Sequence, residues 1–219
     1  MLKRLFVKRK QEVKGEIGFL KIEDWWSNTL TEDERGFLLD NVKYLGSDKS
    51  ARYHLIEADI VSSSLTVLKF ANSMLTYVKS NEELELAKKL VDIAIKNTVV
   101  DDENAFDMHL LLGNMGDVYY KNKNKDNNLS NAIEFYKKQI AISTAAASAW
   151  KKECKIIGGT PGRMPSHRGY TQMAIILEKQ KYYREAYKLC KKANNEEWTG
   201  DWDKRIERLH RKLENMTNI

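Results

Sequence analysis

Residues that interrupt regular secondary structure are scarce in this chain of 219 residues. It has two prolines, Pro161 and Pro165, and they lie close together. Long proline-free stretches rich in Lys, Glu, Leu and Ala favour helices, because proline removes a backbone donor and clashes with the preceding turn. We therefore expect an all-helical fold whose clearest break is the proline segment.

Cysteines and long apolar runs are also scarce. The two cysteines, Cys154 and Cys190, show no spacing typical of a disulfide or a metal site. No window approaches the roughly 20 apolar residues of a membrane span, and the first residues contain no apolar core of signal-peptide length. These absences predict a cytoplasmic protein with reduced cysteines and no membrane contact.

Charge of one sign does not dominate. The 37 basic and 31 acidic side chains leave a net charge of +6, and 42% of the residues are apolar, which is a globular composition. Part of the basic excess lies at the start of the chain, in Lys8, Arg9, Lys10 and their neighbours. Such a segment is an expected contact for nucleic acid or for an acidic protein.

Catalytic and metal-binding patterns are missing as well. None of the histidines, His54, His109, His167 and His210, stands in a metal-ligand spacing, and no nucleophile–base–orienter set is visible. The segment Gly158–Arg163 lacks the Gly-Lys-Ser/Thr ending of a phosphate loop. The sequence thus predicts no catalytic residue, no metal and no cofactor, and argues against an enzyme.

Local patterns divide the chain into a basic segment over 1–30, partly extended or loop, and a helical domain over 31–219. Thr31 and Glu34 form a capping box that predicts a helix reaching about Tyr44. Ser80 and Glu83 form a second one. The remaining expected helices cover 50–78, a stretch after 83, a stretch after 103, 129–150, 166–179, 183–194 and 201–216. Polar residues 121–128 and Gly158–Pro165 are expected to be loops.

Small residues recur within the last expected helical pair. Ala174 and Ala186 are separated by twelve positions, and Ala186 and Ala193 by seven. Small side chains let two antiparallel helices approach closely, and such a helix–turn–helix unit is typical of helical repeats. Repeats of this kind usually present a surface to another macromolecule.

These residues resemble the tetratricopeptide repeat. The best unit has Ala174, Leu177, Ala186, Cys190 and Ala193, and two further units are centred on Gly116 with Ala132 and on Leu75 with Ala87. The anchoring alanines of the three units are 45 and 54 residues apart, against a family period of 34. The resemblance covers about residues 65–195 and implies an irregular α-solenoid with an N-terminal appendage and a C-terminal capping helix.

The ends of the chain resemble a group of bacterial proteins with a Trp-Trp/Thr-x-x-Glu-Arg start and a Gly-Asp-Trp-x-Lys-Arg-Ile finish. That second resemblance implies no activity.

The tetratricopeptide resemblance also implies a concave groove lined by the first helix of each unit. Its polar residues carry net positive charge, so an acidic peptide is the expected ligand. Carried onto this sequence, the groove residues are Lys69, Asn72, Thr76, Lys79, Asp117, Tyr120, Lys121, Arg168, Thr171, Glu178 and Lys179.

The sequence therefore predicts a non-catalytic module that binds a partner protein or peptide as an adaptor, sensor or inhibitor. The alternative is a nucleic-acid-associated factor that uses Lys8, Arg9, Lys10 and basic helix faces. The identity of the partner and the oligomeric state are left open.

Overall fold

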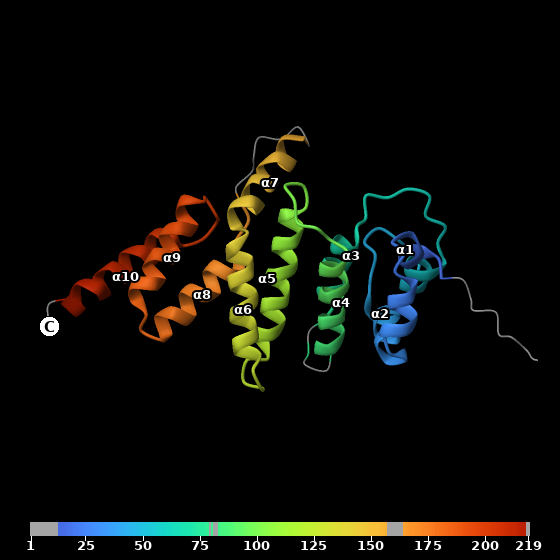
Figure 1. Ribbon diagram of the computed structural model, residues 1–219, viewed down its shortest axis with the longest axis horizontal. Coiled ribbons are helices and arrows are strands. Elements are labelled where there is room, and N and C mark those ends of the chain that lie inside the picture. Colours follow the sequence, from blue (N-terminus) through green and yellow to red (C-terminus); the bar gives the residue numbers. More distant parts are fainter. Residues whose placement is uncertain (1–12, 79, 81–82, 157–163, 218–219) are drawn as a thin grey trace, which may run out of the picture. The chain divides into compact units, whose positions relative to one another are not determined.

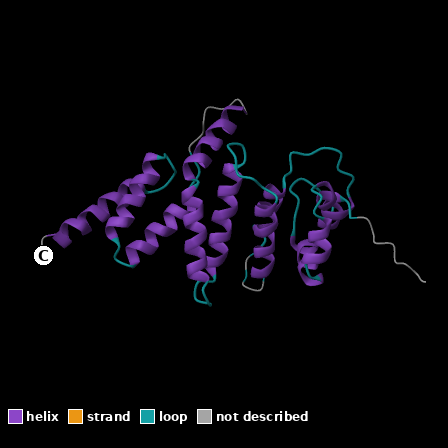
Figure 2. Ribbon diagram, in the orientation of Figure 1, coloured by secondary structure: helices purple, strands orange, loops and turns teal. Residues whose placement is uncertain are grey.

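The computed structural model describes residues 13–78, 80, 83–156 and 164–217. Its described part is helical, with one isolated bridge between Ser166 and Thr199 (Figure 2). The all-α prediction is confirmed. The chain divides into two compact units, 1–66 and 67–219.

The described residues of the first unit form two short α-helices and two single-turn π-helices (Figure 1): α1 (Gly15–Phe19), η1 (Trp25–Thr29), α2 (Glu32–Asn41) and η2 (Tyr53–Glu57). The capping box predicted from Thr31 and Glu34 is confirmed, since each side chain accepts the other residue's backbone N–H. Where an extended segment or loop was expected near residues 12–22, the described residues form α1. The Trp25 and Trp26 rings are buried with Ile17, Leu38 and Leu55 in the core of this unit.

A close contact between α1 and η2 holds the first unit together. The backbone N–H groups of Lys14 and Gly15 donate to the carbonyl groups of Ile56 and Ala58 at 3.0 and 2.9 Å. Gly15 has φ +62°, and a Cβ there would lie 2.4 Å from the carbonyl carbon of Leu55. Glycine is therefore required both by the backbone angle and by the lack of space.

The second unit contains the other eight described helices: α3 (Val67–Leu75), α4 (Leu84–Lys96), α5 (Ala105–Lys121), α6 (Asn128–Ala141), α7 (Ser143–Ile156), α8 (Arg168–Lys179), α9 (Tyr183–Asn195) and α10 (Trp202–Thr217). Helix α5 packs on α3, α4, α6 and α7, whereas α8 packs on α5, α6 and α9. Helix α10 packs on α9. Figure 1 shows α5 and α6 running side by side.

Small residues permit these contacts, as the sequence indicated. Ala174, Ala186, Cys190 and Ala193 are fully or almost fully buried in one cluster with Trp198 and Trp202. Between α5 and α6, a Cβ on Gly116 would lie 2.5 Å from the Tyr136 ring. The small side chains let the helices approach until large neighbours fill the remaining space.

Two predicted helix boundaries were wrong. The helix expected over 50–78 is interrupted, because residues 58–66 are not helical between η2 and α3. Ser63 contributes to this break: its hydroxyl accepts the backbone N–H of Leu65 at 3.0 Å and so competes with helical hydrogen bonding.

The helix expected over 129–150 is divided at Ile142 into α6 and α7. Directly after this break the hydroxyl group of Ser143 lies 3.0 Å from that of Tyr170 and 3.2 Å from the Glu196 carboxylate, so the start of α7 is tied to distant parts of the chain. The other expected loops and helices occur within a few residues of their predicted limits, and α7 extends further, to Ile156. Of the loop Gly158–Pro165, residues 158–163 lie outside the described part of the chain.

We expect Gly15→Ala to lower the free energy of unfolding of the first unit by at least about 2 kcal/mol, because it combines a left-handed backbone with a backbone clash. Urea denaturation followed by tryptophan fluorescence measures this loss. Gly36→Ala is the matched control: its Cβ meets nothing within 4 Å in α2, so it should stabilise by about 0.5–1 kcal/mol. Equal stability of the two variants would contradict the requirement for glycine at position 15.

Candidate functional site

The predicted groove residues on α3 meet the start of α5. The Lys69 ammonium lies 3.9 Å from the Asp107 carboxylate, and the Asn72 amide donates to the Asp107 carbonyl oxygen at 2.8 Å. Asn114 in turn donates to the Asn72 side chain. Thr76 lies beyond the end of α3 and donates to the Ser73 carbonyl oxygen. Lys79 lies outside the described residues, as do Lys8, Arg9 and Lys10.

A second part of the predicted groove joins α5 to α8. The Arg168 guanidinium forms an ion pair with Asp117, and the Tyr136 hydroxyl from α6 donates to the same carboxylate at 2.9 Å. Tyr120 is half-buried, with the Lys123 ammonium 4.5 Å from the centre of its ring. The structure therefore brings together Asp117 and Arg168, which the resemblance assigned to different repeats.

Glu178 makes its ion pairs with α10. It accepts two hydrogen bonds from Arg208, at 3.1 and 2.8 Å, and one from Lys212 at 2.8 Å. The hydrogen bond from Arg208 is the main reason why the pKa of Glu178 falls to about 2. This carboxylate ties α8 to the last helix.

The remaining residues are more exposed. Thr171 is half-buried, and both Lys121 and Lys179 are exposed and form no ion pair with any described residue. We call the predicted groove residues on these helices the α3–α5–α8 face: Lys69, Asn72, Asp117, Tyr120, Lys121, Arg168, Thr171, Glu178 and Lys179. Its unpaired positive charge is concentrated at Lys121 and Lys179.

Two adjoining cavities lie beside α7, and sequence reasoning did not find them. One is about 270 Å³ and the other about 550 Å³, and both are lined by Asp102, Ala149 and Lys152. We call them together the α5–α7 groove. Its other lining residues are Lys69, Glu103, Asp107, Ala141, Thr144, Ala145, Ser148 and Glu153.

Most of the charged side chains that line the α5–α7 groove are acidic. Four of its side chains are carboxylates and two are lysines. Burial raises the pKa of Asp107; Lys69 opposes this effect and the negative charge of Glu153 adds to it. Asp107 is therefore partly desolvated, and it shares the lining of the smaller cavity with Lys69 and Glu153.

Signals for this groove were present in the sequence. Asp102 and Glu103 fit the start of a helix, where acidic side chains interact well with the macrodipole, and no other pattern in the chain distinguishes them. The small residues 144–149 lay inside one long expected helix. Only the break at Ile142 and the packing of α7 on α5 bring these two segments together.

A buried polar cluster near the C-terminal helices has a different character. His109 and His167 are 1% and 0% exposed, their ring centres are 4.5 Å apart, and Trp198 stacks on His109. Burial lowers the pKa of His109 to about 4 and that of His167 to about 2, and the neighbouring His109 adds to the shift at His167. Both rings are neutral at pH 7.

The hydrogen bonds of this cluster are structural. The His167 Nδ1 atom accepts from the backbone N–H of Tyr170 at the start of α8, and Gln139 from α6 donates to the His109 carbonyl oxygen. Glu196 accepts hydrogen bonds from Tyr170 and from Trp198. The cluster thus connects α5, α6, α8 and the turn before α10. It forms part of the core, and the His109 Nδ1 and His167 Nε2 atoms within it have no hydrogen-bond partner among the described residues.

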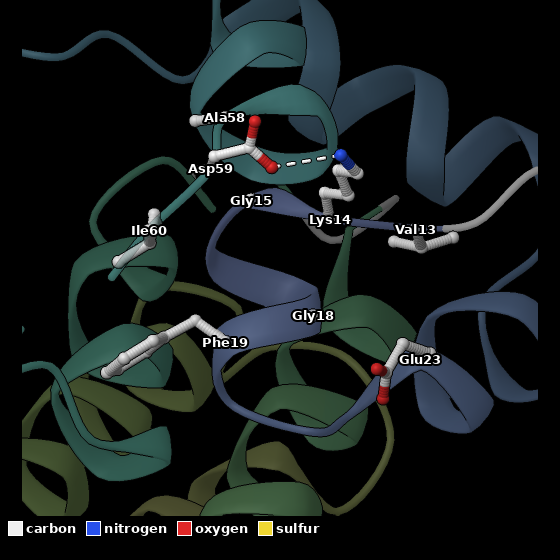
Figure 3. A pocket seen from close by; sticks show the side chains of 9 residues that line it. All are labelled: Val13, Lys14, Gly15, Gly18, Phe19, Glu23, Ala58, Asp59 and Ile60. Atoms are coloured by element: carbon white, nitrogen blue, oxygen red, sulfur yellow. Dashed lines mark hydrogen bonds and ion pairs between the residues drawn. The ribbon is translucent and has the colours of Figure 1, made fainter. Parts of the chain in front are cut away.

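A third cavity, of about 420 Å³, belongs to the first unit. Figure 3 shows Lys14 and Asp59 joined by an ion pair at one end of α1, with Phe19 and Glu23 further along the same segment. The ammonium–carboxylate distance is 2.9 Å, and both side chains are exposed. An exposed pair of this kind contributes little stability and does not activate a nucleophile or a base.

Within the described ranges, no group of three or more His, Cys, Asp or Glu side chains is placed to hold a metal ion. Nor is any helix of that part of the chain long and apolar enough to cross a membrane.

Comparisons with known proteins gave no match. No model of a protein family, no curated protein and no solved structure matches the chain.

The buried histidines predict that stability falls in acid. The unfolded chain binds a proton at each histidine near pH 6.5, whereas the folded chain does not until the pH is much lower. The contribution of each neutral histidine to the free energy of unfolding is therefore fully present above about pH 6.5 and is lost as the pH falls. At pH 5 the loss is about 2 kcal/mol for each histidine. Urea unfolding of the wild-type protein at pH 7 and pH 5 measures this loss.

Two variants assign that loss to the cluster. His109→Gln should lower the free energy of unfolding at both pH values. The difference between the values at pH 7 and pH 5 should be roughly half of that in the wild-type protein. His210→Gln is the control, because His210 is exposed on α10 and paired with Glu214. An unchanged pH dependence in His109→Gln would contradict the assignment.

Proposed function

We propose that the protein is a non-catalytic interaction module of the tetratricopeptide type, which binds a segment of a partner protein on its α3–α5–α8 face. The packing of consecutive helices is the observation that supports it. Helix α5 contacts both α3 and α4, and α8 contacts both α5 and α6. The first helix of each later pair thus packs on both helices of an earlier pair. Neighbouring repeats bury one another's apolar sides in this way.

The chemistry of the face supports a peptide ligand with acidic side chains. Lys121 and Lys179 are exposed and available for charge-assisted hydrogen bonds to carboxylates. Leu110 is an exposed apolar residue on α5, and Tyr120 is half-buried on the same helix. Aromatic and apolar anchors surrounded by steering charges are typical of sites that bind a short segment.

The ion pairs already formed on this face act as its framework. Arg168 is held by Asp117, and Glu178 is held by Arg208 and Lys212. These groups fix the helices to each other, so we assign the contact with the partner to the unpaired lysines and the exposed apolar side chains. The adaptor, sensor and inhibitor roles all use this same physical property, stoichiometric binding.

We expect Lys121→Glu combined with Lys179→Glu to weaken binding of the partner by about 10-fold to 100-fold, because two attractions become repulsions. The measurement is affinity capture from cells of the native source, compared between the wild-type protein and the variant and quantified by mass spectrometry. The matched control is Lys137→Glu with Lys188→Glu, which reverses two exposed charges on α6 and α9.

A partner captured by the wild type and the control and lost from the double variant supports the proposal. A set of captured proteins that is identical for all three forms overturns the assignment to this face. Recovery of nucleic acid that disappears at high salt would instead favour the nucleic-acid alternative.

A further inference from the structure

The buried rings of His109 and His167 are each held in one neutral form by their hydrogen bonds. The Nδ1 atom of His167 accepts the backbone N–H of Tyr170 at 3.1 Å, so the proton of this ring is on Nε2. The Nε2 atom of His109 lies 3.2 Å from the amide nitrogen of Gln139, which is a donor, so the proton of this ring is on Nδ1. Both of these remaining N–H groups are buried without a hydrogen-bond partner among the described residues.

The amide of Gln139 cannot turn to suit a protonated His109. Its oxygen accepts the Gly169 N–H at 2.7 Å, and its nitrogen donates to the His109 carbonyl oxygen at 3.0 Å. A rotated amide would place its nitrogen against the N–H of Gly169 and its oxygen against the carbonyl oxygen of His109. Both hydrogen bonds would then be lost inside the core, so the donor stays directed at the ring.

A second proton on either ring is therefore incompatible with the closed arrangement. On His167 it would point at the Tyr170 N–H, and on His109 it would point at the Gln139 amide nitrogen, which turns each hydrogen bond into a contact between two donors. The two ring centres lie 4.5 Å apart, where two charged rings repel each other. Burial is the main reason why the pKa of His109 falls to about 4 and that of His167 to about 2.

The charged groups around the pair do not compensate for protonation. Lys192 of α9 lowers the pKa of His167 further. In the turn before α10, Glu196 lies 3.8 Å from Lys192 and accepts hydrogen bonds from four other residues: Ser143, Thr144, Tyr170 and Trp198. Arg168 of α8 pairs with Asp117 of α5. The polar side chains that α6 and α7 add to the cluster are uncharged: Gln139, Ser143 and Thr144. Burial raises the pKa of the Tyr170 hydroxyl, which keeps its proton.

The same two rings lie where α8, α9 and α10 join the rest of the second unit. Helix α8 packs on α5 and α6, whereas α9 packs on α8 and α10. His167 caps the start of α8, and the Gln139 amide ties Gly169 of α8 to α6. Trp198, in the turn before α10, stacks on His109 of α5. Helix α5 also packs on α3, α4, α6 and α7, and these contacts do not require α8.

We propose that His109 and His167 form an acid-sensitive switch, in which their protonation separates α8–α10 from α5–α7 while α3–α7 stay folded. The open form takes up protons because its rings regain contact with water. The opening would divide the α3–α5–α8 face, since Lys121 lies on α5 and Lys179 on α8. The proposal does not depend on the proposed function, because its test measures structure and not binding.

Hydrogen–deuterium exchange of the full-length protein at pH 7 and pH 5, followed by mass spectrometry, measures the opening of each helix. Protection factors correct for the slower chemical exchange in acid. Each ring that regains its ordinary pKa raises the opening equilibrium about 20-fold between these pH values, so protection of α8–α10 should fall about 400-fold. At pH 5 it should be at least about tenfold lower than that of α4, which exchanges only when the whole unit unfolds.

His167→Asn removes one of the titrating rings and keeps the cap, because the side-chain oxygen of asparagine can accept the Tyr170 N–H. In this variant the fall in protection of α8–α10 between pH 7 and pH 5 should shrink to about 20-fold. His210→Gln is the matched control, since His210 is exposed on α10, and it should keep the wild-type fall. Glu196→Gln should keep that fall as well, which separates the histidines from the carboxylate of the cluster.

Two results would overturn the proposal. Equal protection of α4 and α8–α10 in the wild-type protein at pH 5 would show that the second unit unfolds as a whole. An equal fall in the wild-type protein and in His167→Asn would show that acid acts at another group. The comparison of helices within the wild-type protein decides the first point even where a variant does not fold.

Discussion

The close approach of α6 to α5 and α8 is the constraint on which the second unit depends. Gly116 leaves the space that the Tyr136 ring occupies, and the buried Gln139 amide then reaches both neighbouring helices. Its nitrogen donates to the His109 carbonyl oxygen at 3.0 Å, and its oxygen accepts the Gly169 N–H at 2.7 Å. A buried amide satisfied on both sides fixes the relative position of three helices more strictly than apolar packing does.

The polar groups around that junction divide into two kinds. The His109, His167 and Glu196 cluster is enclosed. Glu196 and the His167 Nδ1 atom accept hydrogen bonds there, whereas the His109 Nδ1 and His167 Nε2 atoms have no hydrogen-bond partner among the described residues. Burial of the two rings makes the stability of this cluster sensitive to acid. On the α3–α5–α8 face, Asp117 pairs with Arg168 and Glu178 pairs with Arg208 and Lys212, so these charges hold helices together. Lys121 and Lys179 are exposed, and under the proposed function they are the charges available to a partner.

The two surfaces differ in charge. Lys121 and Lys179 give the α3–α5–α8 face its unpaired positive charge, whereas carboxylates outnumber lysines among the residues that line the α5–α7 groove. The modest net charge of +6 gives no sign of this separation, since it sums over both surfaces.

The sequence alone determined the helical class, the capping box at Thr31 and the small residues Ala174, Ala186 and Ala193, because these depend on local propensity and periodicity. Only the tertiary structure showed the break at Ile142, beside which Ser143 contacts residues far along the chain. It also decided which predicted groove charges are consumed in ion pairs, and it created the α5–α7 groove from segments separated in sequence. Pairing and cavities depend on distances between helices, and periodicity within one helix carries no information about such distances.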